Sequence, residues 1–378
     1  LPLALPLALP GPLVQPPEGA LVLPQAARNK HTGEKVAIKH IDRVFADKAD
    51  TVRIIRELRC VASLPTSLAP SRFLTRCESA VCSFLRLLKH PNIIGVVDVL
   101  LPQQRTSFDD IYIVFELLDT DLAHMIRSKT KYDETHRQWL IYQLLAGLKH
   151  IHGANVFHRD LKPGNVLLNA DCDLKICDFG LARCNFPDQK HAVFWTDYVA
   201  TRWYRAPELI CSYYTKYTTA IDIWSVGCIF AELMRRKPLF PGHNVYHQLD
   251  LITDLLGKPT DEEIDKVRSD KARDYLKSLQ FKPARDLTPL FPGVDPLAID
   301  LLERMLTFDP DKRITGQEAL QHAYFPRPIC VASGLCFCAT LPVWPPNRAP
   351  TWAYLLATGA GTLRSSVACR CHRRCHRQ

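Results

Sequence analysis

The stretch from Phe157 to Gly180, FHRDLKPGNVLLNADCDLKICDFG, constrains this chain more than any other. A carboxylate such as Asp160 can orient a hydroxyl and take its proton, and Lys162 can neutralise charge that develops on a phosphate. Asn165 and Asp178 offer the hard oxygen ligands that Mg²⁺ prefers. At these spacings the residues predict the transfer of a phosphoryl group from ATP, bound with Mg²⁺, to a hydroxyl.

The residues between these side chains predict a rigid hairpin. Val166 to Leu168 and Leu174 to Ile176 are short β-forming runs, and the turn-forming residues 169–171 separate them. Adjacent strands would hold the two Mg²⁺ ligands close together. The alternative is an ordinary hairpin whose polar residues are solvated turn residues, and the length of the compound motif argues against it.

The composition indicates a soluble globular protein. The formal net charge is +9, but the segment after Pro326 holds seven Arg and no Lys, Asp or Glu, so the rest of the chain is nearly neutral. That distribution disfavours a nucleic-acid partner. Apart from residues 60–83 and the end of the chain, the cysteines are scattered singles, as expected inside a reducing cell. No apolar run approaches the roughly 20 residues of a membrane helix, so no membrane is expected.

Both ends of the chain differ in composition from the middle. Residues 1–28 are rich in Pro and Leu without periodicity, and the recurring Pro argues against a secretion signal. The final CRCHRRCHRQ contains metal-ligand types, but they lie too close together for a structural zinc site. We expect a low-complexity segment at 1–28 and a disordered tail at 327–378.

The region after residue 28 predicts a strand and then a helix. In KVAIKHI, Val36 and Ile38 share one face and Lys39 lies on the other. Residues 47–59, which include Glu57, carry apolar side chains at helical spacing. Prolines at 65 and 70 would each cost about 3 kcal/mol inside a helix, so this helix must end or loop out after Arg59. Taken alone, Lys39 and Glu57 could be ordinary solvated residues.

Further strands and helices are predicted beyond the insertion. Residues 95–101 and 110–117 alternate as sheet strands, and residues 134–152 form a helix that Gly153 is expected to end. A helix over AIDIWSVGCIFAEL places Asp222 where it could hold the loop around Asp160. Arg313 could pair with a buried Glu208.

The segment between DFG and APE predicts a regulatory switch. Thr196 and Tyr198 flank one Asp in FWTDYVATRWYRAPE. A phosphate on either side chain could order the segment by pairing with an arginine. The arginines available for this are Arg159, Arg202 and Arg205.

With these residues identified, residues 29–325, apart from 60–83, resemble the mitogen-activated protein kinases (MAP kinases). The resemblance is carried by Thr196-Asp197-Tyr198, VATRWYRAPEL, KPLFPGHNVYHQLDLITDLLG and LTFDPDKRIT. The TDY form of the activation lip is similar to that of a subgroup best represented in plants and algae.

The resemblance implies an α+β, bilobal protein-kinase-like fold, with a small β-rich lobe at 29–118 and a large, mostly helical lobe at 119–326. It implies that Lys39, paired with Glu57, holds the nucleotide phosphates, and that Phe115, Glu116 and Leu118 lie at the adenine-binding hinge. It also implies protein substrates phosphorylated on Ser or Thr before Pro, an upstream dual-specificity kinase that acts on Thr196 and Tyr198, and a cytoplasmic or nuclear setting.

Three departures from the family pattern stand out. No GxGxxG motif precedes Lys39, so a phosphate-covering loop and two strands are expected to be missing from the small lobe. Residues 60–83 interrupt the family pattern, and the tail after residue 326 lacks the family's acidic docking segment. Their abrupt change of composition favours an origin in non-coding sequence. Because of the missing loop, the alternative function is a catalytically impaired, pseudokinase-like interaction protein.

Overall fold

The computed structural model describes residues 24–30, 32–41, 89–100, 110–128, 131–184, 202–211, 218–267 and 269–325. The predicted helix at 47–59, the insertion at 60–83 and the tail at 327–378 lie outside these ranges. So do Glu57, Thr196 and Tyr198, and the predictions made for them therefore stay predictions.

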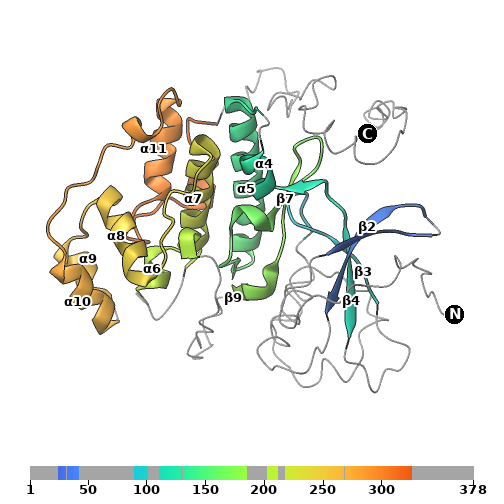
Figure 1. Cartoon of the computed structure of the whole chain (residues 1–378), viewed down its shortest axis with the longest axis horizontal. Coiled ribbons are helices and arrows are strands. Elements are labelled where there is room, and N and C mark those ends of the chain that lie inside the picture. The colour runs from blue at the N-terminus through green and yellow to red at the C-terminus, as the bar shows by residue number, and fades with distance from the viewer. Residues whose placement is uncertain are drawn as a thin grey trace, which may run out of the picture.

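One end of the molecule is an antiparallel sheet (Figure 1). Its strands, in spatial order, are β1 (Gln25–Arg28), β2 (Lys35–Ile41), β4 (Ile111–Glu116) and β3 (Val96–Leu100). Val36 and Ile38 are buried against Val114, whereas Lys39 is partly exposed opposite Ile113. The alternation predicted for this strand is confirmed, because successive side chains of a strand point to opposite faces.

Strand β1 corrects the expected boundary at residue 28. Its sequence, QAAR, contains no β-branched or aromatic residue and gave no sign of a strand. Backbone pairing with β2 nevertheless fixes it, and a tight turn closes the pair: the N–H of Gly33, at φ 73°, donates to the carbonyl of Asn29. Residues assigned to the low-complexity opening thus contribute one strand to the sheet.

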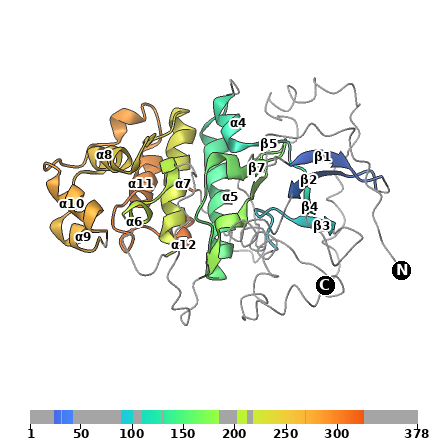
Figure 2. The ribbon, with the colours of Figure 1, turned by 60° about the horizontal axis from the view of Figure 1, so that its bottom comes forward.

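The rest of the described chain is mostly helical (Figure 2). Helices α5 (Glu134–Gly153) and α7 (Ala220–Arg235) lie side by side in its centre. Nearly every side chain of α7 is buried, from Ile221 to Leu233. The other helices are α4 (Leu122–Arg127), α6 (Pro207–Ile210), α8 (Val245–Leu256), α9 (Asp261–Asp265), α10 (Asp270–Ser278), α11 (Pro296–Met305) and α12 (Gly316–Ala319). The α+β fold class is confirmed.

The end of α5 differs from the prediction. Gly153 was expected to stop the helix, yet it is the last helical residue. The left-handed residue that reverses the chain is Asn155, at φ 55°, whose N–H donates to the carbonyl of His152. Asn adopts this conformation more readily than other residues with a Cβ, so the chain does not need glycine to turn here.

The sheet and the helices meet at the segment that precedes β3. The N–H of Ile94 donates to Ile176, and the N–H of Ile176 donates to Asn92, both over 2.9 Å. The buried amide of Asn92 donates to Gln143 on α5 (3.0 Å) and to the carbonyl of Leu174 (2.9 Å). Because these polar groups are buried, breaking the joint would leave unsatisfied hydrogen-bonding atoms.

No helix among the described residues is long and apolar enough to cross a membrane.

The predicted pair of Glu208 and Arg313 is confirmed. Its two bonds measure 2.6 and 3.0 Å, and both side chains are almost wholly buried. The guanidinium also donates to the carbonyls of Ala220 and Phe308. It therefore joins α6 to the start of α7 and to the segment after α11.

We expect Arg313→Leu to lower the free energy of unfolding by about 3–5 kcal/mol, because it leaves the Glu208 carboxylate buried without its partner. Urea denaturation of both proteins measures this loss. Arg304→Leu is the matched control, since Arg304 pairs with Asp300 on the exposed face of α11 and should cost about 1 kcal/mol or less. Equal losses in the two variants would contradict the prediction.

Candidate functional site

The predicted hairpin is present, and it carries the candidate site. Strands β7 (Val166–Leu168) and β8 (Leu174–Ile176) pair in antiparallel register, with Val166 opposite Ile176. Strand β5 (Thr120–Asp121) extends the sheet on the β7 side. A second small pair, β6 (Val156–Phe157) with β9 (Arg183–Cys184), brackets the loop at 158–165 and the turn at 178–181. We call residues 158–165, which carry the predicted base Asp160, the catalytic loop.

Three of the predicted side chains are in direct contact within this loop. Oδ2 of Asp160 accepts a hydrogen bond from Nζ of Lys162 over 2.9 Å and one from Nδ2 of Asn165 over 3.2 Å. The same amide nitrogen also donates to the backbone carbonyl of Asp160 over 2.8 Å. Lys162 and Asn165 therefore hold the Asp160 carboxylate on one side of the loop.

The amide of Asn165 is oriented by these bonds. Its nitrogen faces Asp160, which leaves the amide oxygen as its other polar atom. An oxygen fixed in this way is the kind of ligand that Mg²⁺ takes in proteins. The donor set at this position thus fits the predicted cation.

Asp178 directly follows a residue that is bonded to the backbone of Asn165. The N–H of Cys177 donates to the carbonyl of Asn165 over 3.0 Å, directly after the paired strands. Asp178 then takes a left-handed conformation at φ 63° and ψ 66°. Asp is among the few residues that tolerate this conformation, which ends β8 and begins the turn at 179–181. A second carboxylate is thus placed one residue beyond the contact with Asn165.

Asp222 holds the catalytic loop, as the sequence predicted. Its carboxylate is wholly buried and accepts the backbone N–H groups of His158 and Arg159, each over 2.8 Å. Nε2 of His152 donates to it over 2.9 Å. Arg159 is held in the left-handed region at φ 71°, a strained position for a long side chain. This anchor fixes the backbone immediately before Asp160.

Burial by itself raises the pKa of Asp222, but the hydrogen bond and charge of His152, together with His158 and the N–H of Arg159, lower it below its usual value overall. The carboxylate is therefore held in its ionised form. An ionised oxygen accepts the loop's N–H groups more strongly than a neutral acid would.

His158 connects the catalytic loop to the turn after β8, a role that the sequence analysis did not predict. Its ring is fully buried and meets Phe179 edge-on, with 4.9 Å between ring centroids. Nε2 lies 2.9 Å from the carbonyl of Cys177, and Nδ1 accepts the N–H of Asp160. These two contacts fix the orientation of the ring, with Nε2 toward Cys177 and Nδ1 toward the backbone of Asp160. The sequence signal was a histidine between an apolar run and a charged pair.

The predicted nucleotide-binding residues lie in and beside the sheet. Lys39 is on the face of β2 opposite to Val36 and Ile38. Phe115 is buried in the main core, and Leu118 packs against that core. The carboxylate of Glu116 points to other protein groups: it accepts the N–H of Gly95 over 2.7 Å and lies 3.0 Å from Nζ of Lys175.

The three arginines expected to hold a phosphate have different neighbours. Arg159 donates from Nη1 to the carbonyl of Leu181 over 3.5 Å, and Arg202 donates from Nη1 to the carbonyl of His243 over 2.9 Å. The N–H of Arg205 donates to the carbonyl of Arg202 within a short turn. Since Thr196 and Tyr198 lie outside the described residues, the pairing stays a prediction.

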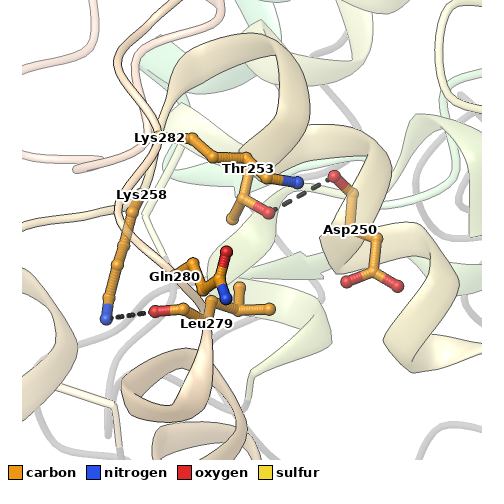
Figure 3. A pocket seen from close by; sticks show the side chains of 6 residues that line it. All are labelled: Asp250, Thr253, Lys258, Leu279, Gln280 and Lys282. Carbon is orange, nitrogen blue, oxygen red and sulfur yellow. Dashed lines mark hydrogen bonds between the residues drawn. The ribbon is translucent and has the colours of Figure 1, made fainter.

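A cavity lies away from this site, between α8 and the segment after α10 (Figure 3). Lys258 donates to the carbonyls of Lys277 and Leu279, and Lys282 pairs with Asp254. Thr253 donates to the carbonyl of Asp250. Lys258 and Lys282 of this cavity are thus engaged in contacts between the α8 and α10 segments. The cavity is a gap between packed helices and forms no part of the candidate site.

Asp222→Asn should destabilise the protein at pH 7, because the amide carries one acceptor oxygen and no charge for three donors. Since the pKa of Asp222 is lower in the folded chain, its contribution is fully present above about pH 4, the usual Asp value, and is lost as the pH falls through the folded pKa. Urea denaturation of both proteins between pH 7 and pH 3 measures the difference. A difference that stays constant or widens toward pH 3 would contradict this assignment.

The comparisons with known proteins agree with this geometry. The protein kinase domain model matches residues 77–325, beginning inside the segment 60–83 that departs from the family pattern. Mitogen-activated protein kinase 15 of Oryza sativa subsp. japonica is 54% identical over 300 residues, which cover 79% of this chain and 55% of that protein.

Two relatives from Arabidopsis thaliana are similar to the same extent. Mitogen-activated protein kinase 16 is 54% identical over 300 residues, covering 79% of this chain and 49% of the relative. Mitogen-activated protein kinase 9 is 52% identical over 308 residues, covering 82% and 56%. The chain thus spans about half the length of the curated relatives it matches. With the family model matching well over half of its residues, the chain belongs to the protein kinase domain family, whose members use ATP.

Proposed function

We propose that this chain is a serine/threonine kinase of the MAP kinase type, which transfers the γ-phosphoryl group of ATP to Ser or Thr residues that precede Pro in protein substrates. The observation that carries the proposal is the contact of Asp160 with Lys162 and Asn165. Asn165 directly precedes β7, and Asp178 follows its partner strand β8 by two residues. The similarity to plant MAP kinases supports the narrower substrate class.

Asp160 is the proposed base. Lys162 and Asn165 both donate to its Oδ2, so Oδ1 is the oxygen that can accept the proton of the substrate hydroxyl. Held in this way, the carboxylate needs little reorganisation when the hydroxyl arrives. Lys162 lies close enough to Asp160 to neutralise charge on the transferred phosphate as well.

Asn165 and Asp178 are the proposed Mg²⁺ ligands. When bound, the ion would neutralise negative charge on the phosphate oxygens of the nucleotide. Lys39, paired with Glu57, is proposed to hold the other phosphates. The backbone from Glu116 to Leu118, beside Phe115, is proposed to hold adenine.

A MgATP titration followed by thermal unfolding tests whether the chain binds nucleotide. At a concentration one hundred times the dissociation constant, binding should stabilise the fold by about 2.7 kcal/mol. If millimolar MgATP causes no shift, the result favours the interaction protein that lacks catalysis, in keeping with the absence of a GxGxxG motif before Lys39.

Asp160→Asn should then lower the rate of phosphoryl transfer to a Ser-Pro peptide by about 10²- to 10⁴-fold, because the amide cannot take the proton. The nucleotide-induced shift should remain, since the side chain is placed to meet the acceptor hydroxyl. A variant that kept the wild-type rate would show that Asp160 is not the base.

We further propose that an upstream dual-specificity kinase switches the protein on by phosphorylating Thr196 and Tyr198. Arg159, Arg202 and Arg205 are the proposed phosphate partners. Arg202 would have to share or exchange its present bond to the carbonyl of His243. The proposed setting is the cytoplasm or the nucleus, where such a cascade operates.

Treatment with a dual-specificity kinase of the MAP kinase cascade should raise the transfer rate on the order of 5- to 150-fold, the range expected of a coupled conformational switch. Phosphopeptide mass spectrometry should place the phosphates on Thr196 and Tyr198. The variant with Thr196→Ala and Tyr198→Phe should not respond, whereas Thr215→Ala, with a change outside the TDY segment, should respond fully. Activation of the double variant would contradict the proposed switch.

A further inference from the structure

We infer that the carboxylate of Glu116 is a positioning group: it ties the end of β4 to the strand that precedes Asp178 and thereby sets the affinity of the site for nucleotide. The inference rests on the function proposed above, because the ligand that it concerns is MgATP. The inference concerns the side chain of Glu116, whereas the adenine contact was proposed for the backbone at 116–118.

One oxygen of Glu116 meets donors from two segments that are far apart in the sequence. Oε1 accepts the backbone N–H of Gly95 over 2.7 Å, and it lies 3.0 Å from Nζ of Lys175. Gly95 directly precedes β3, and Lys175 is the middle residue of β8. This carboxylate therefore joins the end of β4 to the start of β3 and to the β7–β8 hairpin.

Glycine at position 95 allows the carboxylate to come this close. A Cβ at that position would lie 3.2 Å from Oε1 of Glu116, closer than most such contacts in proteins. A larger residue would push the carboxylate away from the N–H that it accepts. The small residue at 95 and the acid at 116 thus form a matched pair.

Strand β8 is a firm attachment point for this tether. The backbone of Ile176 bonds on both sides to the segment at 92–94, and the carbonyl of Leu174 accepts the buried amide of Asn92. The side chains of Leu174 and Ile176 are buried, whereas that of Lys175 is partly exposed between them. Because β8 cannot shift easily, its lysine restrains whatever pairs with it.

The charges around Lys175 favour an acid at position 116. The pKa of His90 is lowered by its burial first, then by the neighbouring His150, and then by Lys175. The rings of His90 and His150 are stacked, with 4.9 Å between their centroids. Lys175 thus acts on His90 as a positive charge, and the carboxylate of Glu116, 3.0 Å from Nζ, is the anion that offsets this charge.

The tether lies where β4 ends and the chain crosses to the helices. Asp178 follows Lys175 by three residues and begins the turn after β8. A restraint between these two segments fixes the proposed adenine-binding backbone relative to a proposed Mg²⁺ ligand. Such preorganisation improves affinity because less ordering remains for the ligand to impose.

The test uses charge reversal in the full chain. Glu116→Lys and Lys175→Glu should each raise the dissociation constant for MgATP by about two- to fivefold, a modest change because the pair is partly exposed. The variant with both changes restores the ion pair and should recover much of the loss, although it lacks the acceptor for Gly95. Glu116→Gln, which keeps that acceptor but not the charge, should fall between the wild type and Glu116→Lys. Isothermal titration with MgATP measures all four.

Lys271→Glu and Asp274→Lys form the matched control, alone and together. Both residues are exposed on α10, and they repeat the same charge changes away from the sheet. They should leave the dissociation constant unchanged. Unfolding midpoints without nucleotide, compared between the two sets, separate a loss of positioning from a loss of folding.

The possible outcomes are distinct. If the wild type binds MgATP and the Glu116 and Lys175 variants bind it equally well, this inference is wrong while the proposed function stands. A double reversal that binds more weakly than either single reversal would also overturn it. If the wild type itself does not bind MgATP, the proposed function fails and this inference fails with it.

Discussion

The catalytic loop depends on one buried carboxylate. Asp222 has no contact with solvent, and its charge is offset by His152 and by two backbone N–H groups from the loop itself. A buried charge is stable only when its partners stay in place, so α7 and the loop cannot separate without a cost of several kcal/mol. This anchor also sustains the left-handed backbone at Arg159 and thereby fixes where Asp160 points.

The same anchor also restrains the segment at 177–179, on the opposite side of the site. The backbone N–H of His158 donates to Asp222, and its ring contacts the carbonyl of Cys177 and the ring of Phe179. Asp178 lies between those two residues. The proposed base and a proposed cation ligand lie on segments separated by the whole hairpin, and both are fixed to the same helix. A site must hold its reacting groups within a fraction of an ångström of the productive geometry, and this shared anchor provides such a restraint.

The sheet is joined to this scaffold by buried amides as well as by apolar packing, since Ile111, Ile113 and Phe115 of β4 belong to the main core. Asn92 and Gln143 bind each other and the backbone of Leu174, while Gln143 also donates to the carbonyl of Cys172. Buried hydrogen bonds are directional, so they fix orientation as well as distance. The carboxylate of Glu116 adds a partly exposed contact next to this joint, where a small change of charge can act on the site without unfolding the core.

Much of the site could be predicted because its parts are local in the sequence. The hairpin of β7 and β8 follows from two β-forming runs around a turn, and its spacing brings Asn165 near Asp178. The strand with Lys39 follows from simple alternation. In contrast, β1 has no propensity signal, and the end of α5 uses Asn155 where a glycine two residues earlier seemed the obvious stop. The roles of His152 and His158 were missed because their partners lie on other segments, 70 residues away for His152 and 19 residues away for His158.

By itself, the sequence determined the chemistry available to this protein: which oxygens and ammonium groups lie on one hairpin, and which family pattern they match. The sequence also predicted that Asp222 holds the loop and that Arg313 pairs with Glu208. Only the tertiary structure decided that His152 joins Asp222 from 70 residues away and that the carboxylate of Glu116 turns to Gly95 and Lys175. No periodicity links such distant positions, because their pairing arises from the packing of helices and strands, which removes water and leaves each buried charge to be satisfied by whichever group the fold brings beside it.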